Sequence, residues 1–174
     1  PGNVPYLVDN LWEWLRPEGR PSRRHAAYAS PTPALALAAA APRPEDQAHY
    51  VVTTVTFPGH HAMAQLPVAD ARFHGDTRIL PKLLNVALGL RWPELNDAQR
   101  LRLTALYLPA SSREDVNSAM LELPEATRQE VVALSTFWQD ATLIHPDQHA
   151  FEHPEGELFF QAHDGYKLTL FQSG

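Results

Sequence analysis

The amino-acid sequence predicts an α+β fold, with strands near both ends of the chain and helices in the middle. Runs of β-branched and aromatic residues occur in the first and last thirds of the sequence. Residues 79–138 instead carry apolar side chains at helical spacing. An Asp-Gly pair between two apolar runs near the C-terminus adds a hairpin signal. Strands and helices that are segregated along a chain in this way are typical of α+β proteins.

The N-terminal region, residues 4–72, is predicted to combine strands with one short helix. The runs "HAAYAS" (25–30) and "HYVVTTVTF" (49–57) are rich in the residues that favour strands. Between them, "PALALAAAA" (33–41) favours a helix, because alanine has the highest helix propensity. The expected order is therefore strand, helix, strand.

The middle of the chain is predicted to be helical throughout. Ser112 is a candidate N-cap and Pro124 a candidate first residue of the next helix. Between them, the i, i+3, i+4, i+7 pattern of one helix face is formed by Val116, Ala119, Met120 and Leu123. The block at 79–138 resembles an insertion between two strand regions.

The C-terminal part, residues 141–171, is predicted to return to strands. The runs "ELFFQA" and "YKLTLF" flank His163-Asp164-Gly165, and Asp-Gly between two such runs is a strong signal for a tight turn. We therefore expect these two strands to pair with each other as a β-hairpin.

Composition limits the classes of function. The chain has 174 residues, 44% of them apolar, which suits one domain with a core of its own. Its 14 basic and 20 acidic residues give a net charge of -6, which disfavours a nucleic acid as the main partner. Cysteine is absent, which excludes disulfides and thiolate zinc sites.

A membrane location is not expected, because no apolar stretch approaches the length of about 20 residues that a membrane-spanning helix needs. The start, "PGNVPYLVDNLW", lacks the order of basic, apolar and small residues typical of a signal peptide. We therefore expect a soluble chain, and its location stays open.

Two acidic residues stand at the start of the last strand region. Glu155 and Glu157 are two apart, so their carboxylates would project from one face if the strand begins by residue 155. For such a pair a solvated turn at a sheet edge is the ordinary interpretation. The functional interpretation is a site formed by the two carboxylates at the start of the strand.

Taken together, these stretches resemble the ADP-ribosyltransferase fold, in particular the bacterial toxin and effector type with an arginine, a serine and a Glu-x-Glu motif. The matching stretches are "LWEWLRPEG" for a first strand that ends in arginine, "HAAYASPTPALALAAA" for the serine strand and "EGELFF" for the acidic strand. The resemblance covers about 4–57 and 141–171. It implies one domain over 1–174, with a split mixed sheet core of about six or seven strands and the block at 79–138 inserted.

The sequence departs from the pattern of this family in two ways. The serine motif is Ser-Pro-Thr-Pro where the family has Ser-Thr-Ser. The gap from Arg16 to Ser30 is short, so Arg23 or Arg24 is an alternative to Arg16 as the phosphate-binding arginine.

The resemblance also implies NAD as the substrate and gives each of the two glutamates a role. Glu157 would stabilise the positive charge that develops on the ribose as nicotinamide leaves, much as in glycoside cleavage. Glu155, the upstream acid, goes in this family with arginine on a protein as the acceptor. A bacterial effector of this type, secreted or injected, would also meet an immunity or chaperone protein.

The residues expected to bind NAD come from the basic cluster and the strand that follows it. Arg16 or Arg24 would hold the pyrophosphate, because a guanidinium offers a planar fork of donors. The resemblance gives Tyr28 the stacking on nicotinamide and Ser30 the support of the glutamate, and His25 completes the basic cluster. Each has an ordinary interpretation too: a solvated basic loop, a packed tyrosine and a turn serine.

Two other classes of function compete with this interpretation. His145, His149 and His153 are four apart, as the ligands of a metal hydrolase on a helix would be, but Pro146 and Pro154 disfavour that helix. We therefore expect no metal. A protein-binding module without catalysis, with Trp12 and Trp14 as interface anchors, is the second competitor.

Overall fold

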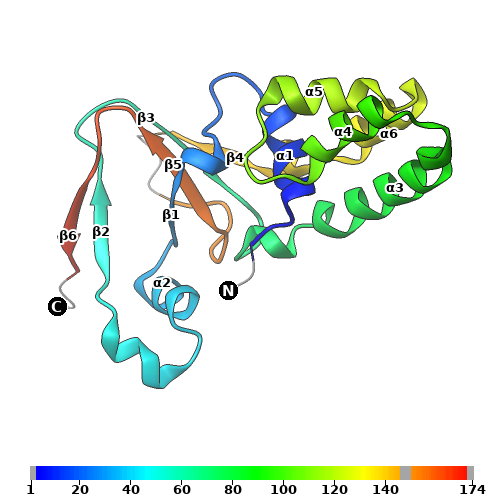
Figure 1. The fold of residues 1–174 in the computed structure, drawn as a ribbon. Coiled ribbons are helices and arrows are strands. Elements are labelled where there is room, and N and C mark those ends of the chain that lie inside the picture. Colours follow the sequence, from blue (N-terminus) through cyan, green and yellow to red (C-terminus); the bar gives the residue numbers. More distant parts are fainter. Residues whose placement is uncertain (1–2, 146–149, 172–174) are drawn as a thin grey trace. The chain divides into compact units, whose positions relative to one another are not determined.

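The computed structural model describes residues 3–145 and 150–171. It shows an α+β protein with seven α-helices and six strands in that part of the chain, as the sequence predicts. The chain divides into two compact units (Figure 1). Pro1–Glu18 and Ala71–Asp140 form one, here called the helical unit, and Gly19–Asp70 and Ala141–Gly174 form the other, the sheet unit. The prediction of one domain over residues 1–174 stays a prediction.

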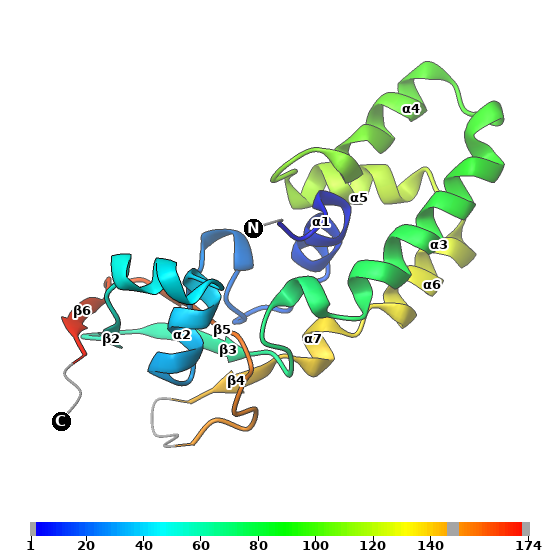
Figure 2. The ribbon, with the colours of Figure 1, turned by 90° about the horizontal axis from the view of Figure 1, so that it is seen from below.

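The helical unit confirms the expected helical block and adds a helix from the N-terminus. Its helices are α1 (Tyr6–Trp14), α3 (Asp76–Arg91), α4 (Asp97–Thr104), α5 (Arg113–Leu121), α6 (Glu125–Leu134) and α7 (Phe137–Asp140). Figure 2 shows α3 and α6 side by side. Among the described residues, no helix is long and apolar enough to cross a membrane.

Sequence signals set the bounds of these helices. The Ser112 hydroxyl accepts a hydrogen bond from the Asp115 N–H at 3.0 Å and caps α5, as expected. Pro124 stands directly before α6, one position earlier than the first helical residue that was expected. The predicted apolar face of α5 is buried, since Val116, Ala119 and Met120 are inaccessible to solvent.

The expected strand that ends at Arg16 is wrong, because residues 6–14 form α1. The alternation of tryptophan and glutamate in "LWEWLR" is typical of a strand, but the longer pattern is helical. Leu7, Val8, Leu11 and Trp12 recur at helical spacing, and all four are buried. Trp12 is 1% exposed and stacks on Phe137 with 4.0 Å between ring centroids. This tryptophan therefore anchors the core of the helical unit and not an interface.

The sheet unit contains all six strands and α2 (Pro33–Ala40). Its strands are β1 (Ala27–Ala29), β2 (Thr53–Thr56), β3 (His61–Gln65), β4 (Thr142–Ile144), β5 (Leu158–Ala162) and β6 (Lys167–Leu170). β1, α2 and β2 confirm the expected order of strand, helix, strand. The strands form a four-stranded sheet, β1-β5-β3-β4, and a two-stranded sheet, β2-β6. All pairs among the described strands are antiparallel, where a mixed sheet was expected.

The expected hairpin between β5 and β6 is wrong, because these strands belong to different sheets. β2 pairs with β6, and β3 pairs with β5. Together the two pairs form one long antiparallel ribbon that is interrupted once. The interruption has the same length in both segments of the ribbon, residues 57–60 and 163–166, so the register of strand pairing is the same on either side of it.

Asp164 and Gly165 lie in this interruption and shape it. The Asp164 carboxylate accepts a hydrogen bond from the His60 N–H at 2.9 Å. Gly165 has a φ of 77°, a conformation that glycine adopts without strain. The Asp-Gly pair thus bends a ribbon and does not close a hairpin.

Candidate functional site

Arg23 and Glu157 form a largely buried ion pair in the sheet unit. An Arg23 guanidinium nitrogen lies 2.9 Å from a Glu157 carboxylate oxygen, and the two side chains are 12% and 13% exposed. Arg23 opens a 3₁₀ turn, Arg23–His25, and Glu157 stands directly before β5. Charge-assisted hydrogen bonds of this kind are among the stronger polar interactions in proteins.

The pairing of β1 with β5 brings Ser30 to the same place as Glu157. Ala29 lies opposite Leu158, so the next residue on each chain is Ser30 on one side and Glu157 on the other. The two residues that the sequence assigns to the serine and acidic motifs therefore flank the same end of the β1-β5 pair.

Aromatic rings surround the guanidinium of this pair. The Arg23 Cζ atom lies 5.1 Å from the centroid of Tyr28 and 5.7 Å from that of Phe159, which are cation–π distances. The Tyr28 hydroxyl donates a hydrogen bond of 2.7 Å to the Arg23 carbonyl. Tyr28 lies opposite Phe159 across the strand pair and is 51% exposed, so its ring borders both the ion pair and solvent.

The loop before Glu157 is fixed by a buried glutamine. The Gln65 side-chain amide donates to the His153 carbonyl at 2.7 Å, and its oxygen accepts from the His153 N–H at 3.1 Å. Gly156 fits against this clamp, since a Cβ atom there would overlap the Leu66 carbonyl. Gln65 and Gly156 were missed by the sequence analysis, because neither residue type carries a signal of its own for such a clamp.

Replacing Gly156 with alanine is expected to lower the free energy of unfolding by about 2 kcal/mol or more, because backbone would have to move. Thermal unfolding followed by circular dichroism measures the effect. Gly89→Ala is the matched control, because an added Cβ has open space there and alanine favours a helix. Equal stabilities of Gly156→Ala and the parent would contradict the close approach.

The other residues expected at the site lie elsewhere. β5 begins at Leu158, so Glu155 is outside the strand and exposed, and the two acids do not share a strand face. The reason is the clamped turn at Gly156, which separates them. Arg24 is half-buried and His25 is exposed, both in the turn that holds Arg23.

Arg16 belongs to the helical unit, whereas the other expected site residues belong to the sheet unit. Its guanidinium pairs with the Glu13 carboxylate at 3.0 Å, one helical turn back. Of the three arginines considered, Arg23 is the one beside Glu157.

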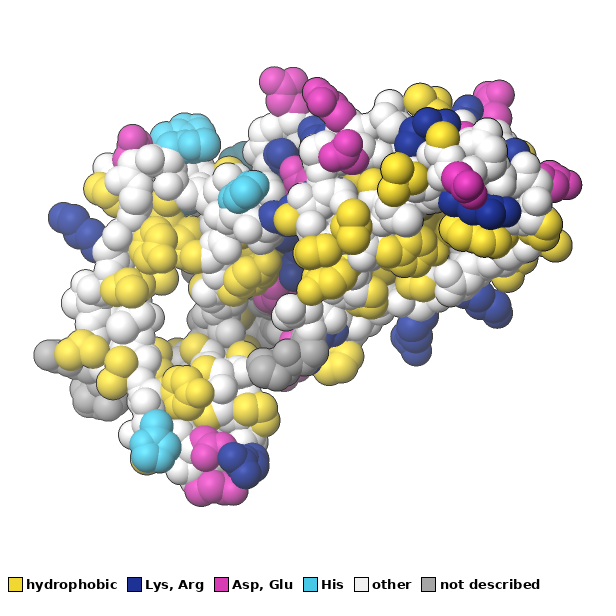
Figure 3. Space-filling view, viewed as in Figure 1, with side chains coloured by type: hydrophobic (Ala, Val, Ile, Leu, Met, Phe, Trp, Pro, Cys, Tyr) yellow, Lys and Arg dark blue, Asp and Glu magenta, His cyan; other side chains and the backbone are white. Residues whose placement is uncertain are grey.

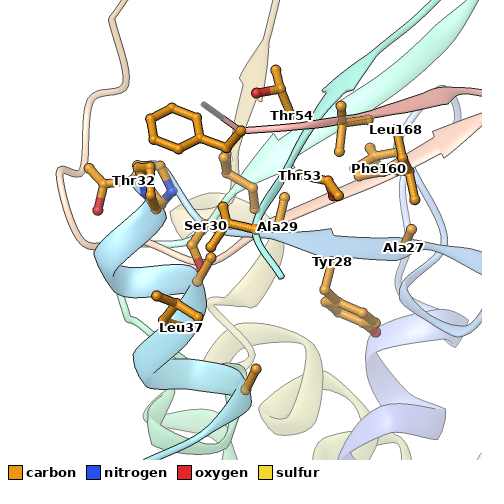
Figure 4. A pocket seen from close by; sticks show the side chains of 18 of the residues that line it. Ala27, Tyr28, Ala29, Ser30, Thr32, Leu37, Thr53, Thr54, Phe160 and Leu168 are labelled. Atoms are coloured by element: carbon orange, nitrogen blue, oxygen red, sulfur yellow. The ribbon is translucent and has the colours of Figure 1, made fainter. Parts of the chain in front are cut away.

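A cavity of about 570 Å³ lies in the sheet unit between β1, α2 and the β2-β6 pair (Figure 4). Tyr28 and Ser30 are among the residues that border it. Leu158 and Phe160 of β5 line it, so Glu157 and Phe159 belong to the opposite face of that sheet. Figure 4 likewise shows the ring of Tyr28 directed away from Phe160 and Leu168.

The described residues contain no group of three or more histidine, aspartate or glutamate side chains that could hold a metal ion. His149, the middle member of the expected histidine series, lies outside the described residues. The expectation that His145, His149 and His153 bind no metal therefore stays a prediction.

Comparisons of the chain with protein-family models, with curated proteins and with solved structures find no match. The site therefore has to be interpreted from its own residues and their chemistry.

Proposed function

We propose that the protein is an NAD-dependent mono-ADP-ribosyltransferase, which transfers ADP-ribose to a protein acceptor and releases nicotinamide. The observation that carries the proposal is the Arg23–Glu157 pair at the place where β1 ends and β5 begins, which Ser30 also flanks. An arginine, a serine after a strand and a glutamate before a later strand are the three residue types of the resemblance. In the proposal, the two antiparallel sheets are the split core, and the helical block at 79–138 is the insertion.

Glu157 is the proposed catalytic acid. As the bond between ribose C1′ and the nicotinamide nitrogen breaks, the electron pair leaves with nicotinamide and positive charge develops on the ribose. A carboxylate held below the sugar stabilises that charge more than it stabilises the ground state. The acceptor nucleophile then bonds to C1′ and loses its proton.

Arg23 is the proposed phosphate-binding arginine, in place of Arg16 or Arg24. Its planar fork of donors suits a pyrophosphate, and it lies next to the acid that would face the ribose. Tyr28, with its half-exposed ring, is proposed to stack on nicotinamide. Arg24, in the same turn, extends the positive potential, and His25 stands next to it in sequence.

The acceptor and the biological setting belong to the same proposal. Glu155 is exposed, as a residue that orients an acceptor arginine would be. A bacterial effector that is secreted or injected, with an immunity or chaperone protein as a partner, is the setting that the resemblance implies.

A protein-interaction module without catalysis is the second candidate, and one observation favours it. Large apolar side chains gather on the face of the helical unit that Figure 3 shows. In this unit Val86 and Leu90 of α3 and Leu101 of α4 are each more than half exposed, with Leu90 at 77%. Exposed apolar side chains that gather on one face favour an interaction site.

The purified chain incubated with NAD is expected to release nicotinamide, measured by chromatography, and to do so faster when bacterial or host lysate supplies acceptors. Transfer is expected to label a lysate protein with the ADP-ribose of a tagged NAD. A chain that neither binds nor cleaves NAD would refute the enzyme and leave the interaction module.

A further inference from the structure

The cavity of the sheet unit has a lining of unusual chemistry for a chain with 34 charged residues among 174. Among the described residues, no aspartate, glutamate, lysine, arginine or histidine lines it. Its wall consists of aliphatic and aromatic side chains with several hydroxyl groups from serine, threonine and tyrosine. An occupant that complements this wall carries no charge, because a charge in such a wall would lose its hydration without a partner.

The cavity meets β2 along the edge of the strand. Residues 50–55 all line it, one after another. Because successive residues of a strand point to opposite faces, a cavity lined by every residue of a run reaches the edge of that strand. Leu168 of β6, the partner of Val55, also lines it, so the cavity extends from this edge over one face of the β2-β6 pair. The occupant therefore faces the backbone of β2.

The hydrogen-bond pattern shows which backbone groups of β2 point to that edge. The Phe171 N–H donates to the Val52 carbonyl at 2.9 Å, so Val52 bonds toward the β6 side of the ribbon. In an antiparallel ladder bonded and non-bonded residues alternate, so Thr54 also bonds to β6, whereas Thr53 and Val55 direct N–H and C=O away from it. No strand among the described residues pairs with β2 on that side.

The opposite wall limits the size of the occupant. It is formed by β1, the end strand of the four-stranded sheet, and by α2. Small side chains line this wall, namely Ala27, Ala29, Ala36 and Ala40. The space of about 570 Å³ suits one short extended segment.

We propose that the cavity binds an extended, uncharged segment of another protein, about four residues long, which adds to β2 as a strand. Its backbone would bond to Thr53 and Val55, and its side chains would fill the apolar wall. A purely apolar molecule such as an acyl chain would leave those backbone groups without partners, at a cost in free energy. The inference goes beyond the proposed transferase activity and does not depend on it.

Selection from a displayed library of random octapeptides against the intact chain tests the proposal. The enriched peptides are expected to be uncharged over about four consecutive residues and rich in β-branched side chains. Ala36→Phe, which fills the cavity, is expected to abolish binding, whereas Ala39→Phe on the exposed side of α2 retains it. Failure to enrich any peptide, or binding that survives Ala36→Phe, would overturn the proposal.

Two measurements on the best synthetic peptide separate strand addition from other occupancy. Methylating its backbone nitrogens is expected to weaken binding by about tenfold or more, since two hydrogen bonds are lost. Binding is expected to slow amide hydrogen exchange at Thr53 and Val55 and to leave Thr54 unchanged. Equal binding of the methylated peptide would point to an apolar ligand, and dimers that Ala36→Phe dissociates would point to a second copy; either result refutes the proposal.

Discussion

Replacing Glu157 with glutamine is expected to lower the rate of nicotinamide release from NAD by about a hundredfold or more, while NAD still binds. Glutamine keeps the size of the side chain and can still bond to Arg23, but it lacks the charge that stabilises the ribose in the transition state. Single-turnover kinetics of nicotinamide release give the rate, and equilibrium titration with NAD gives the affinity.

Glu155→Gln is the matched control for Glu157→Gln, because both variants lose one carboxylate from the same motif. Glu155 lies outside β5 and is exposed, so its loss is expected to suppress transfer to a protein acceptor and to leave slow hydrolysis of NAD. Thermal unfolding shows whether the loss of the Arg23–Glu157 ion pair has altered the fold. Turnover of Glu157→Gln equal to that of the parent would show that another group is the catalytic acid.

Much of the secondary structure is predictable because its signals are local. Ser112 caps α5 and Pro124 precedes α6, and each needs only its neighbours in sequence to do so. The strand, helix and strand at β1, α2 and β2 likewise follow from composition over fewer than ten residues each.

The pairing of strands was less predictable, because a local turn signal does not say which strands meet. Asp164 and Gly165 form the expected tight bend, but the Asp164 carboxylate bonds to His60, more than a hundred residues away in sequence. That hydrogen bond holds the two segments of the ribbon together where the strand pairing is interrupted. A hairpin and a bent ribbon therefore give the same sequence pattern at this position.

The candidate site was predictable in part for the same reason. Ser30 and Glu157 stand out by their positions at strand ends, and the β1–β5 pairing brings those ends together. Arg23, by contrast, is one of three candidate arginines, and only the 2.9 Å contact with Glu157 singles it out. The cation–π contacts of Arg23 also depend on strand pairing and have no signal in sequence.

The core of the helical unit depends on a further long-range contact that sequence patterns do not show. Asp76, at the start of α3, is 1% exposed, although an isolated aspartate is expected at the surface. Its carboxylate accepts hydrogen bonds from Trp12 Nε1 at 2.8 Å, the Ser135 hydroxyl at 3.0 Å, the Phe137 N–H at 3.2 Å and the Thr136 N–H at 3.2 Å. One carboxylate thus joins α1 and α3 to the segment before α7.

Replacing Asp76 with alanine is therefore expected to lower the free energy of unfolding of the helical unit by about 3–5 kcal/mol, because buried donors are left without an acceptor. Tryptophan fluorescence during urea unfolding measures this unit, since all four tryptophans, at positions 12, 14, 92 and 138, belong to it. Asp140→Ala is the control: this carboxylate accepts from His74 Nε2 at 3.1 Å but is 43% exposed, so water replaces it at a cost of about 1 kcal/mol or less. If Asp76→Ala unfolded at the same urea concentration as Asp140→Ala, the Asp76 carboxylate would not be what joins α1 to the rest of the helical unit. The buried side chains of α1, such as Leu11 and Trp12, would then have to hold this helix in place.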